Sequence, residues 1–189
     1  MMWRRFKSDG GTAAVEFALI APICVLLVSG VFEFTYRFKV ADEFERYAFQ
    51  AGDYLSREDA LTSSEIALVY DMASEMMRTA EVTPDMLDLS VTSVGYEEDG
   101  APLLLWRRQH GASLGEIDLS DALGLEKPSR SVLRIDAEFT FASSFTKRFG
   151  QTTTLRRTLY FVPRVTRAIS IDGEIHDSGV TWTFYDVGA

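Results

Sequence analysis

The chain is poor in the residues on which several kinds of site depend. It has one cysteine and two histidines, His110 and His176, among 189 residues. A single cysteine excludes an internal disulfide, a Cys-rich zinc site and a dithiol redox motif, and two histidines argue against His-rich metal chemistry. The 19 basic residues are outnumbered by 28 acidic ones, for a net charge of −9. Most of the chain is therefore a poor partner for nucleic-acid phosphates, and we expect no metal or other cofactor.

What the chain does contain is an ordinary globular composition. Apolar residues make up 47% of the sequence and charged residues 25%. These proportions exclude a disordered chain, and the length allows one compact domain and little more.

The N-terminus joins a basic leader to a long apolar run. Residues 1–11 carry three basic side chains and one acidic one, and residues 12–32 contain a single ionisable side chain, Glu16. As a helix, those 21 residues span about 31 Å, close to the thickness of a bilayer's hydrocarbon core. A basic leader before such a run predicts that the N-terminus is cytoplasmic.

We therefore expect three parts: the leader, a membrane-spanning helix over residues 12–35, and an extracytoplasmic domain over residues 36–189. Two alternatives stay open. One is a secretory signal peptide cleaved after Gly30, which would release a soluble periplasmic binding module. The other is an unprocessed single-pass membrane protein whose outer domain is a scaffold. Neither accounts for Glu16, because charged residues in a span are costly and usually functional.

The helical pattern does not stop at residue 32. Between Gly30 and Gly52 there is no glycine or proline, and the predicted helix runs for about 45 residues, to Leu55. Pro22 is expected to kink or locally unwind it. Apolar residues at spacings of three and four form one stripe along the second half: Phe34, Phe38, Ala41, Phe44, Ala48, Ala51 and Leu55.

A second helix and several strands are predicted after this helix. Thr62 and Glu65 fit a capping box that opens a helix over residues 62–80. Its predicted apolar stripe consists of Ile66, Val69, Tyr70, Ala73, Met76, Met77 and Ala80. Alternating patterns predict strands at 87–96 with a bulge at Ser93, 103–106, 133–141, 153–162 and 180–185, and residues 107–130 form a long loop with one helical turn. The fold class is therefore α+β, with a long N-terminal helix packed on an antiparallel sheet.

Enzymatic motifs are weak in this sequence. Ser170, Asp172, His176, Asp177 and Ser178 lie close together, but no nucleophile-elbow pattern surrounds either serine.

The stretch around Asp172 also lacks the repeated ligands of a calcium loop. We expect a protein that is not an enzyme. The basic pairs at 107–108 and 156–157 are expected to be solvated or ion-paired.

The string Gly11-Thr12-Ala13-Ala14-Val15-Glu16-Phe17 resembles a prepilin processing site. It is similar to that of the TadE-like proteins, minor pseudopilins of the tight-adherence (Flp-type) pilus. The resemblance implies a pilin-like fold and cleavage by a prepilin peptidase between Gly11 and Thr12. Glu16 then becomes the fifth residue of the mature chain, followed by Phe17. Near the other end, Phe161-Val162-Pro163-Arg164-Val165 resembles a Pro-Arg segment of the same family.

The resemblance also implies partners and a location. The partners are a prepilin peptidase, other pilins and pseudopilins, and an inner-membrane assembly platform. The location is the bacterial inner membrane, with the C-terminal domain in the periplasm.

The chemistry of Glu16 is consistent with such processing. Cleavage would create an α-amino group on Thr12, cationic at neutral pH with an ordinary pKa of about 7.7–8.0. A carboxylate in an apolar setting needs a cationic or hydrogen-bonding partner. The amine on the same helix, or that of a neighbouring subunit, would supply one.

Overall fold

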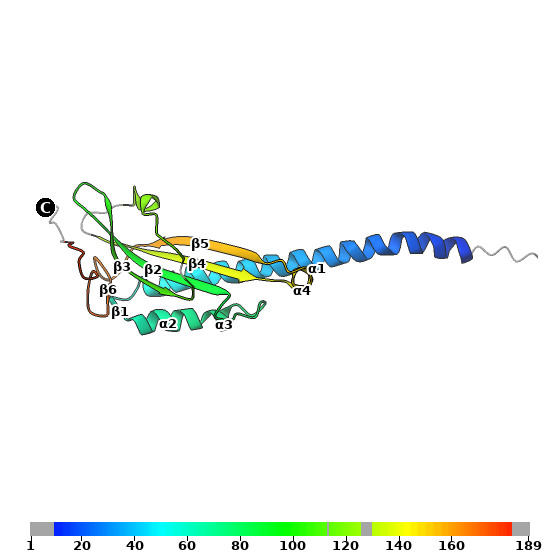
Figure 1. Ribbon diagram of the computed structural model, residues 1–189, viewed down its shortest axis with the longest axis horizontal. Coiled ribbons are helices and arrows are strands. Elements are labelled where there is room, and N and C mark those ends of the chain that lie inside the picture. Colours follow the sequence, from blue (N-terminus) through cyan, green and yellow to red (C-terminus); the bar gives the residue numbers. More distant parts are fainter. Residues whose placement is uncertain (1–9, 113, 126–129, 183–189) are drawn as a thin grey trace, which may run out of the picture. The chain divides into compact units, whose positions relative to one another are not determined.

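The computed structural model describes residues 10–112, 114–125 and 130–182 (Figure 1). The predicted leader lies almost wholly outside the described residues. The chain divides into two compact units at Phe38/Lys39, and each is described by itself. The helical elements are α1 (Gly10–Leu55), α2 (Ser63–Asp71), α3 (Ala73–Met76), a 3-10 turn η1 (Ser120–Ala122) and α4 (Ser144–Lys147). The strands are β1 (Ala60–Leu61), β2 (Leu87–Tyr96), β3 (Pro102–His110), β4 (Val132–Phe141), β5 (Thr153–Phe161) and β6 (Ser170–Ile171).

The first unit is the N-terminal part of α1. This helix has 46 residues, which confirms the predicted length. It continues through Pro22 without the expected unwinding. Pro22 removes one backbone donor, but the neighbouring turns keep their own hydrogen bonds.

The second unit is built on one antiparallel sheet with the strand order β3-β2-β4-β5 (Figure 1). The central strands are paired along their lengths, with Leu87 opposite Phe139 and Val91 opposite Ile135. The structure thus confirms the α+β class with a long apolar N-terminal helix and an antiparallel sheet.

The C-terminal part of α1 packs on one face of this sheet. The ring of Phe44 stacks on that of Phe139 with centroids 6.0 Å apart, and Phe49 contacts Phe161. The buried helix residues are Val40, Phe44, Tyr47, Ala48, Ala51 and Leu55. The predicted stripe is confirmed from Phe44 onward, whereas Phe34 and Phe38 are exposed in the first unit.

The predicted second helix is shorter than expected. Thr62 caps α2 and forms the predicted capping box with Glu65. The helix is interrupted at Met72, and α3 ends at Met76 rather than near residue 80. Beyond α3, Glu43 of α1 accepts hydrogen bonds from the backbone N–H and hydroxyl of Thr79. These bonds satisfy a backbone donor that a longer helix would have satisfied internally, so the chain can turn toward the sheet.

Strand β2 carries apolar side chains on both faces of the sheet. Leu87, Leu89 and Val91 lie on the face that α1 covers, whereas Val94 and Tyr96 lie on the opposite face. The predicted irregularity at Ser93 is confirmed as a register shift between Ser93 and Val94. It affects only the pairing with β3, where one extra residue is accommodated, because β2 stays in regular register with β4.

The loop around η1 covers this second apolar group. Val94, Tyr96, Val132 and Ala122 are buried together, and the Tyr96 hydroxyl donates to the Ala122 carbonyl at 2.9 Å. The predicted helical turn within residues 107–130 is confirmed as η1. The loop is shorter than predicted because β3 continues to His110.

The C-terminal segment returns to the end of α1. Strand β6 pairs in parallel with β1, a contact between residues about 110 positions apart that the sequence analysis missed. Residues 180–182 form no strand, and the rest of the strand predicted at 180–185 lies outside the described residues. Trp182 is instead buried, and its indole N–H donates to the Tyr96 carbonyl at 3.0 Å.

Candidate processing and assembly segment

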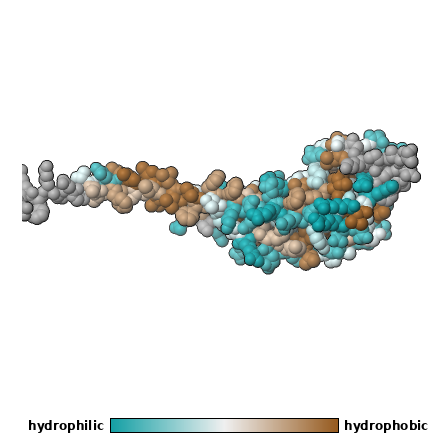
Figure 2. Space-filling model, turned by 180° about the vertical axis from the view of Figure 1, so that it is seen from behind, coloured by the Kyte–Doolittle hydropathy of each residue, from teal (hydrophilic) through white to brown (hydrophobic). Residues whose placement is uncertain are grey.

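The N-terminal part of α1 presents apolar side chains in every direction. From residue 11 to residue 32, every side chain is exposed except the half-buried Ala21. Figure 2 shows the resulting apolar surface in brown. Among the described residues, α1 is the one helix long and apolar enough to cross a membrane. Such a surface is unfavourable in water, so it needs a membrane or other apolar surroundings.

The predicted processing bond lies in the first turn of this helix. The structure describes α1 from Gly10, so Gly11 and Thr12 lie in the first described turn of the helix. Glu16 follows Thr12 by four residues, which corresponds to about 6 Å along the axis and to the same side of the helix. Phe17 is 72% exposed. The geometry thus places the backbone nitrogen of Thr12 and the carboxylate of Glu16 about one turn apart.

The two acidic side chains in the described part of this unit, Glu16 and Glu33, differ in their surroundings. Glu33 accepts a hydrogen bond from Arg37 in the next turn, with Oε1 and Nε 2.6 Å apart. Glu16 is exposed and has no hydrogen-bond or ion-pair partner within the described residues of the chain. A carboxylate in that position is available to a partner that the described residues do not supply.

The similarity of the chain to a known family lies in this helix. Over residues 11–51 the chain matches the TadE-like protein family. The predicted resemblance is confirmed over this TadE-like segment, which starts at Gly11 and covers α1 almost to its end. No curated protein and no solved structure matches the chain.

The Pro-Arg segment contacts the end of the same helix. Pro163 is buried, and the backbone N–H of Arg164 donates to the Ser56 carbonyl at 3.0 Å. The guanidinium of Arg164 also pairs with Asp53, which in addition accepts a hydrogen bond from Arg57. The Pro-Arg segment is therefore held, within the second unit, against the C-terminal end of α1.

The residues considered for a hydrolytic site serve other contacts. Asp172 accepts hydrogen bonds from the hydroxyl and backbone N–H of Ser63 at 2.6 and 2.9 Å. The Ser63 hydroxyl is the first cause of the lowered pKa of Asp172. Asp177 pairs with Arg108 at 3.0 Å. The two carboxylates hold the C-terminal segment to α2 and β3, and neither is aligned with a histidine and a serine as a triad.

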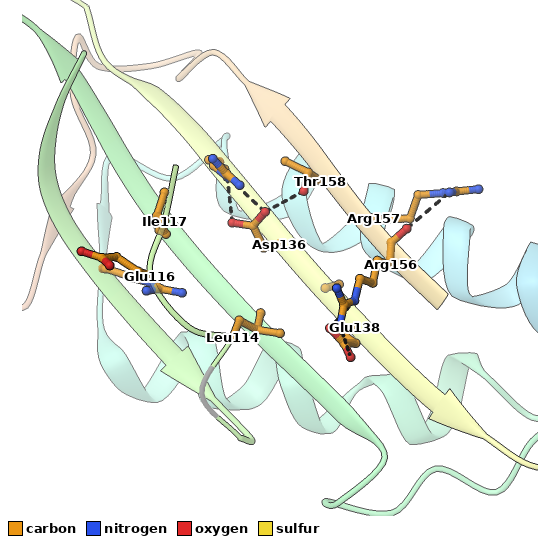
Figure 3. Close-up of a pocket in the computed structure, with 11 residues that line it drawn as sticks. Leu114, Glu116, Ile117, Asp136, Glu138, Arg156, Arg157 and Thr158 are labelled. Atoms are coloured by element: carbon orange, nitrogen blue, oxygen red, sulfur yellow. Dashed lines mark hydrogen bonds and ion pairs between the residues drawn. The ribbon is translucent and has the colours of Figure 1, made fainter. Parts of the chain in front are cut away.

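A polar pocket of about 130 Å³ lies on the sheet face away from α1 (Figure 3). At its centre the buried Arg134 pairs with Asp136 at 2.8 Å, and Asp136 also accepts from the Thr158 hydroxyl. Beside them, Arg156 pairs with Glu138 at 2.7 Å. The charges of this pocket largely neutralise one another, which is typical of a structural ion-pair network.

The predicted ion pairing is confirmed for three of the four arginines in the two basic pairs. Arg108 and Arg156 pair as described, and Arg157 lies 3.5 Å from Glu45 of α1. Arg107 donates to the Ser90 hydroxyl and the Gly115 carbonyl. Burial lowers its pKa, while Asp136 acts in the opposite direction. Within the described ranges, no group of three or more His, Cys, Asp or Glu side chains is arranged to hold a metal ion.

The methionines in the region of the predicted second helix divide between the core and an apolar hollow. Met77 is buried, whereas Met72 and Met76 line an apolar hollow of about 190 Å³ beside Tyr47. The Tyr47 hydroxyl donates to the Val69 carbonyl at 3.2 Å, and burial raises its pKa. Tyr47 lies outside the predicted apolar stripe of α1, so that pattern did not mark it as a core residue.

Proposed function

We propose that this chain is a minor pseudopilin that assists assembly of an Flp-type pilus and has no enzymatic activity of its own. The observation that carries the proposal is the position of Glu16 near the start of an exposed apolar helix within the TadE-like segment, where no described residue pairs with it. The helix anchors the protein in the inner membrane as a single span. Its N-terminus is cytoplasmic, and the sheet domain lies in the periplasm. Its partners are a prepilin peptidase, other pilins and the assembly platform.

In the proposed processing step, the peptidase hydrolyses the amide bond between Gly11 and Thr12. Water is added across the bond, so Gly11 keeps a carboxylate on the released leader and Thr12 gains an ammonium group. Loss of the leader removes three basic residues and one acidic residue, which changes the net charge of the chain from −9 to −11. After this step, the apolar helix starts with a single ammonium group in place of the basic leader.

The new ammonium group would neutralise Glu16 in one of two ways. Within one chain, the two groups are one helical turn apart. Between chains, the Glu16 of one subunit would accept the Thr12 ammonium of its neighbour, which would set the axial register of packed helices. The second arrangement explains better why the carboxylate is retained in a segment where it lowers membrane affinity.

Mass spectrometry of the mature protein, isolated from membranes of the producing cell, tests this proposal. The expected N-terminal residue is Thr12. A terminus at Val31 would show that signal peptidase releases a soluble module, and an intact Met1 would show an unprocessed anchor. The family match extends across Gly30 without interruption, which supports a helix that is kept whole.

A further inference from the structure

The turn between β4 and β5 has an inverted distribution of polar and apolar side chains. Its polar residues Ser143 and Thr146 are buried, with 3% and 5% of their surfaces exposed. Its two phenylalanines are on the outside: Phe145 is 54% exposed and Phe149 is 65% exposed. A turn that faces only water would gain from the reverse arrangement, since each phenylalanine has a large apolar surface.

The hydrogen bonds of this turn hold the two rings in place. Ser143 caps α4 through a capping box with Thr146, which explains why these two side chains are inside. At the other end, the N–H groups of Gly150 and Gln151 donate to the carbonyls of Lys147 and Thr146, and Gly150 has a φ of 66°. This is a Schellman-type cap that glycine favours.

The exposed rings form a single apolar patch with a basic border. Phe145 and Phe149 are four residues apart and lie on one side of the turn, with ring centroids 5.2 Å apart. Lys147 and Arg148 lie between them in sequence, and both are exposed. Residues 142–152 contain no Asp or Glu, although the whole chain has a net charge of −9. Neither cation is in an ion pair within the described part of the chain. We call Phe145, Lys147, Arg148 and Phe149 the aromatic-basic tip.

The contacts of the second unit show at which end of it this tip lies. Leu133 pairs with Phe161, which contacts α1 at Phe49, and farther along β4 Phe139 stacks on Phe44. Strand β4 therefore runs along α1 toward lower residue numbers, and α4 follows its last residue, Phe141 (Figure 1). The tip is at the end of the second unit where Lys39 joins it to the membrane-spanning part of α1.

The length of the chain places this end close to the bilayer. If the span ends near residue 35, Lys39 is about 6 Å farther along the helix. A layer of headgroups adds about 5–7 Å to each side of the hydrocarbon core. Phenylalanine side chains of elements that lie on a membrane surface insert at the boundary between headgroups and acyl chains, and basic side chains are attracted to anionic lipids.

We propose that the aromatic-basic tip docks on the anionic lipid surface of the same bilayer that α1 spans. Phe145 and Phe149 insert at headgroup level, and Lys147 and Arg148 contact lipid phosphates. Docking gives the periplasmic domain a second attachment besides the helix and limits its tilt. The inference rests on the membrane anchor of the proposed function, but not on cleavage after Gly11.

Site-specific fluorescence on the full-length chain tests this docking. Because Cys24 is the only cysteine, a Cys24→Ser background accepts one NBD label at Phe149→Cys or, as a second position, at Phe145→Cys. The matched control is Leu123→Cys, a residue 58% exposed beside η1. The labelled proteins are reconstituted in phosphatidylcholine vesicles with a minor fraction of phosphatidylglycerol, and nitroxide-bearing lipids serve as quenchers near the headgroups.

Quenching at positions 149 and 145 should be several-fold stronger than at position 123. Lys147→Glu with Arg148→Glu should reduce it to the level of the control, and so should omission of phosphatidylglycerol. Equal quenching at positions 149 and 123 would overturn the proposal. A shielded label whose emission depends on the protein-to-lipid ratio, without lipid quenching, would assign the tip to a second copy and also overturn it.

A label on the native Cys24 separates the two proposals. Strong quenching of Cys24 by deep nitroxides together with an unquenched position 149 would overturn the docking alone. An unquenched Cys24 would overturn the membrane anchor of the proposed function and the docking with it.

Discussion

Among the described residues of the first unit, the carboxylates are those of Glu16 and Glu33, and their surroundings differ. Glu33 pairs with Arg37 on its own helix, whereas Glu16 has no partner among the described residues. A difference between the two in assembly would therefore report the need for an external partner and not the mere presence of a negative charge.

Glu16→Gln should be processed and inserted normally, yet bind other pilins more weakly. Removing the charge lowers the cost of insertion, by less than the roughly 2.5–3.5 kcal/mol that applies at the centre of a span. The Thr12 ammonium is then left without a counter-charge in an apolar setting. The measurement is cleavage and co-purification with pilus subunits. Glu33→Gln is the matched control and should co-purify like the wild type. If Glu16→Gln also assembles normally, Glu16 only extends to the membrane surface.

Asp172 offers a second prediction at this scale, for the dependence of stability on pH. Hydrogen bonds from Ser63 lower its pKa below the ordinary value of 3.8 in the folded chain. A lowered folded-state pKa stabilises the fold at pH values above the unfolded pKa, and this stabilisation is lost as the pH falls through the folded pKa. Asp172→Asn should therefore lower Tm at neutral pH, and the difference from wild type should shrink toward zero below about pH 3.8.

Thermal unfolding in detergent micelles, followed by near-UV circular dichroism, measures this difference. Asp59→Asn is the control, because Asp59 is exposed and its carboxylate has no partner among the described residues. A Tm difference for Asp172→Asn that stays constant down to pH 3 would contradict the role given to its charge.

At the scale of elements, helices and strands with a long periodic pattern were predicted from the sequence, whereas elements that form through distant contacts were missed. Helix α1 and strand β4 follow long, regular apolar patterns, and both were predicted almost to the residue. The β1–β6 pairing involves two residues from each strand and has no periodic signal. The burial of Arg134 depends on the η1 loop, whose Asp118 carbonyl accepts its hydrogen bond, and no local pattern indicates this contact.

The functional segments also include one that the sequence indicates and one that only the folded chain reveals. The residues Gly11 to Phe17 could be proposed from the sequence because they form a contiguous string, and this string lies within the TadE-like segment. The aromatic-basic tip was not found, because Phe145 and Phe149 look like ordinary core residues until the capping box turns them outward. Exposure of an apolar residue is a property of the folded chain, which the local sequence does not encode.

Two glycines of α1, Gly30 and Gly52, differ in the space around them. Alanine in a helix is normally favoured over glycine by about 1 kcal/mol. A Cβ at position 52 would overlap the ring of Phe161, whereas a Cβ at position 30 would meet nothing within 4 Å. Gly52→Ala should therefore destabilise the domain by about 1–3 kcal/mol, the usual cost of overpacking.

Chemical denaturation of the full chain in micelles, monitored through the tryptophan fluorescence of the domain, measures this effect. Gly30→Ala should leave the denaturation midpoint unchanged or raise it slightly. If both variants behave alike, α1 does not pack on β5 as closely as described.

At the scale of the whole molecule, the two units have opposite solvent requirements. The first unit exposes apolar side chains all round, and the second buries its apolar residues in one core under α1 and a smaller one under the η1 loop. These requirements are those of a single-pass anchor in lipid and a domain in water, and the proposed membrane topology can be tested.

A reporter fused after Ala189 should be active only if it folds outside the cytoplasm. The basic leader and the apolar helix together predict this orientation. Paired fusions of alkaline phosphatase, active when exported, and a fluorescent protein, active when cytoplasmic, measure it in the producing cell. Strong fluorescence with no phosphatase activity would reverse the proposed topology.

Strand β2 has a consequence for the fidelity of folding. Its side chains serve two apolar groups on opposite faces, Leu87 to Val91 under α1 and Val94 to Tyr96 under the η1 loop. A slip of one residue against β4 would move both sets to the wrong face at once, and a slip of two would take Tyr96 away from the Ala122 carbonyl. Neither error could be relieved by rearranging one face alone, so the strand discriminates against misregistered sheets without the need for a disulfide.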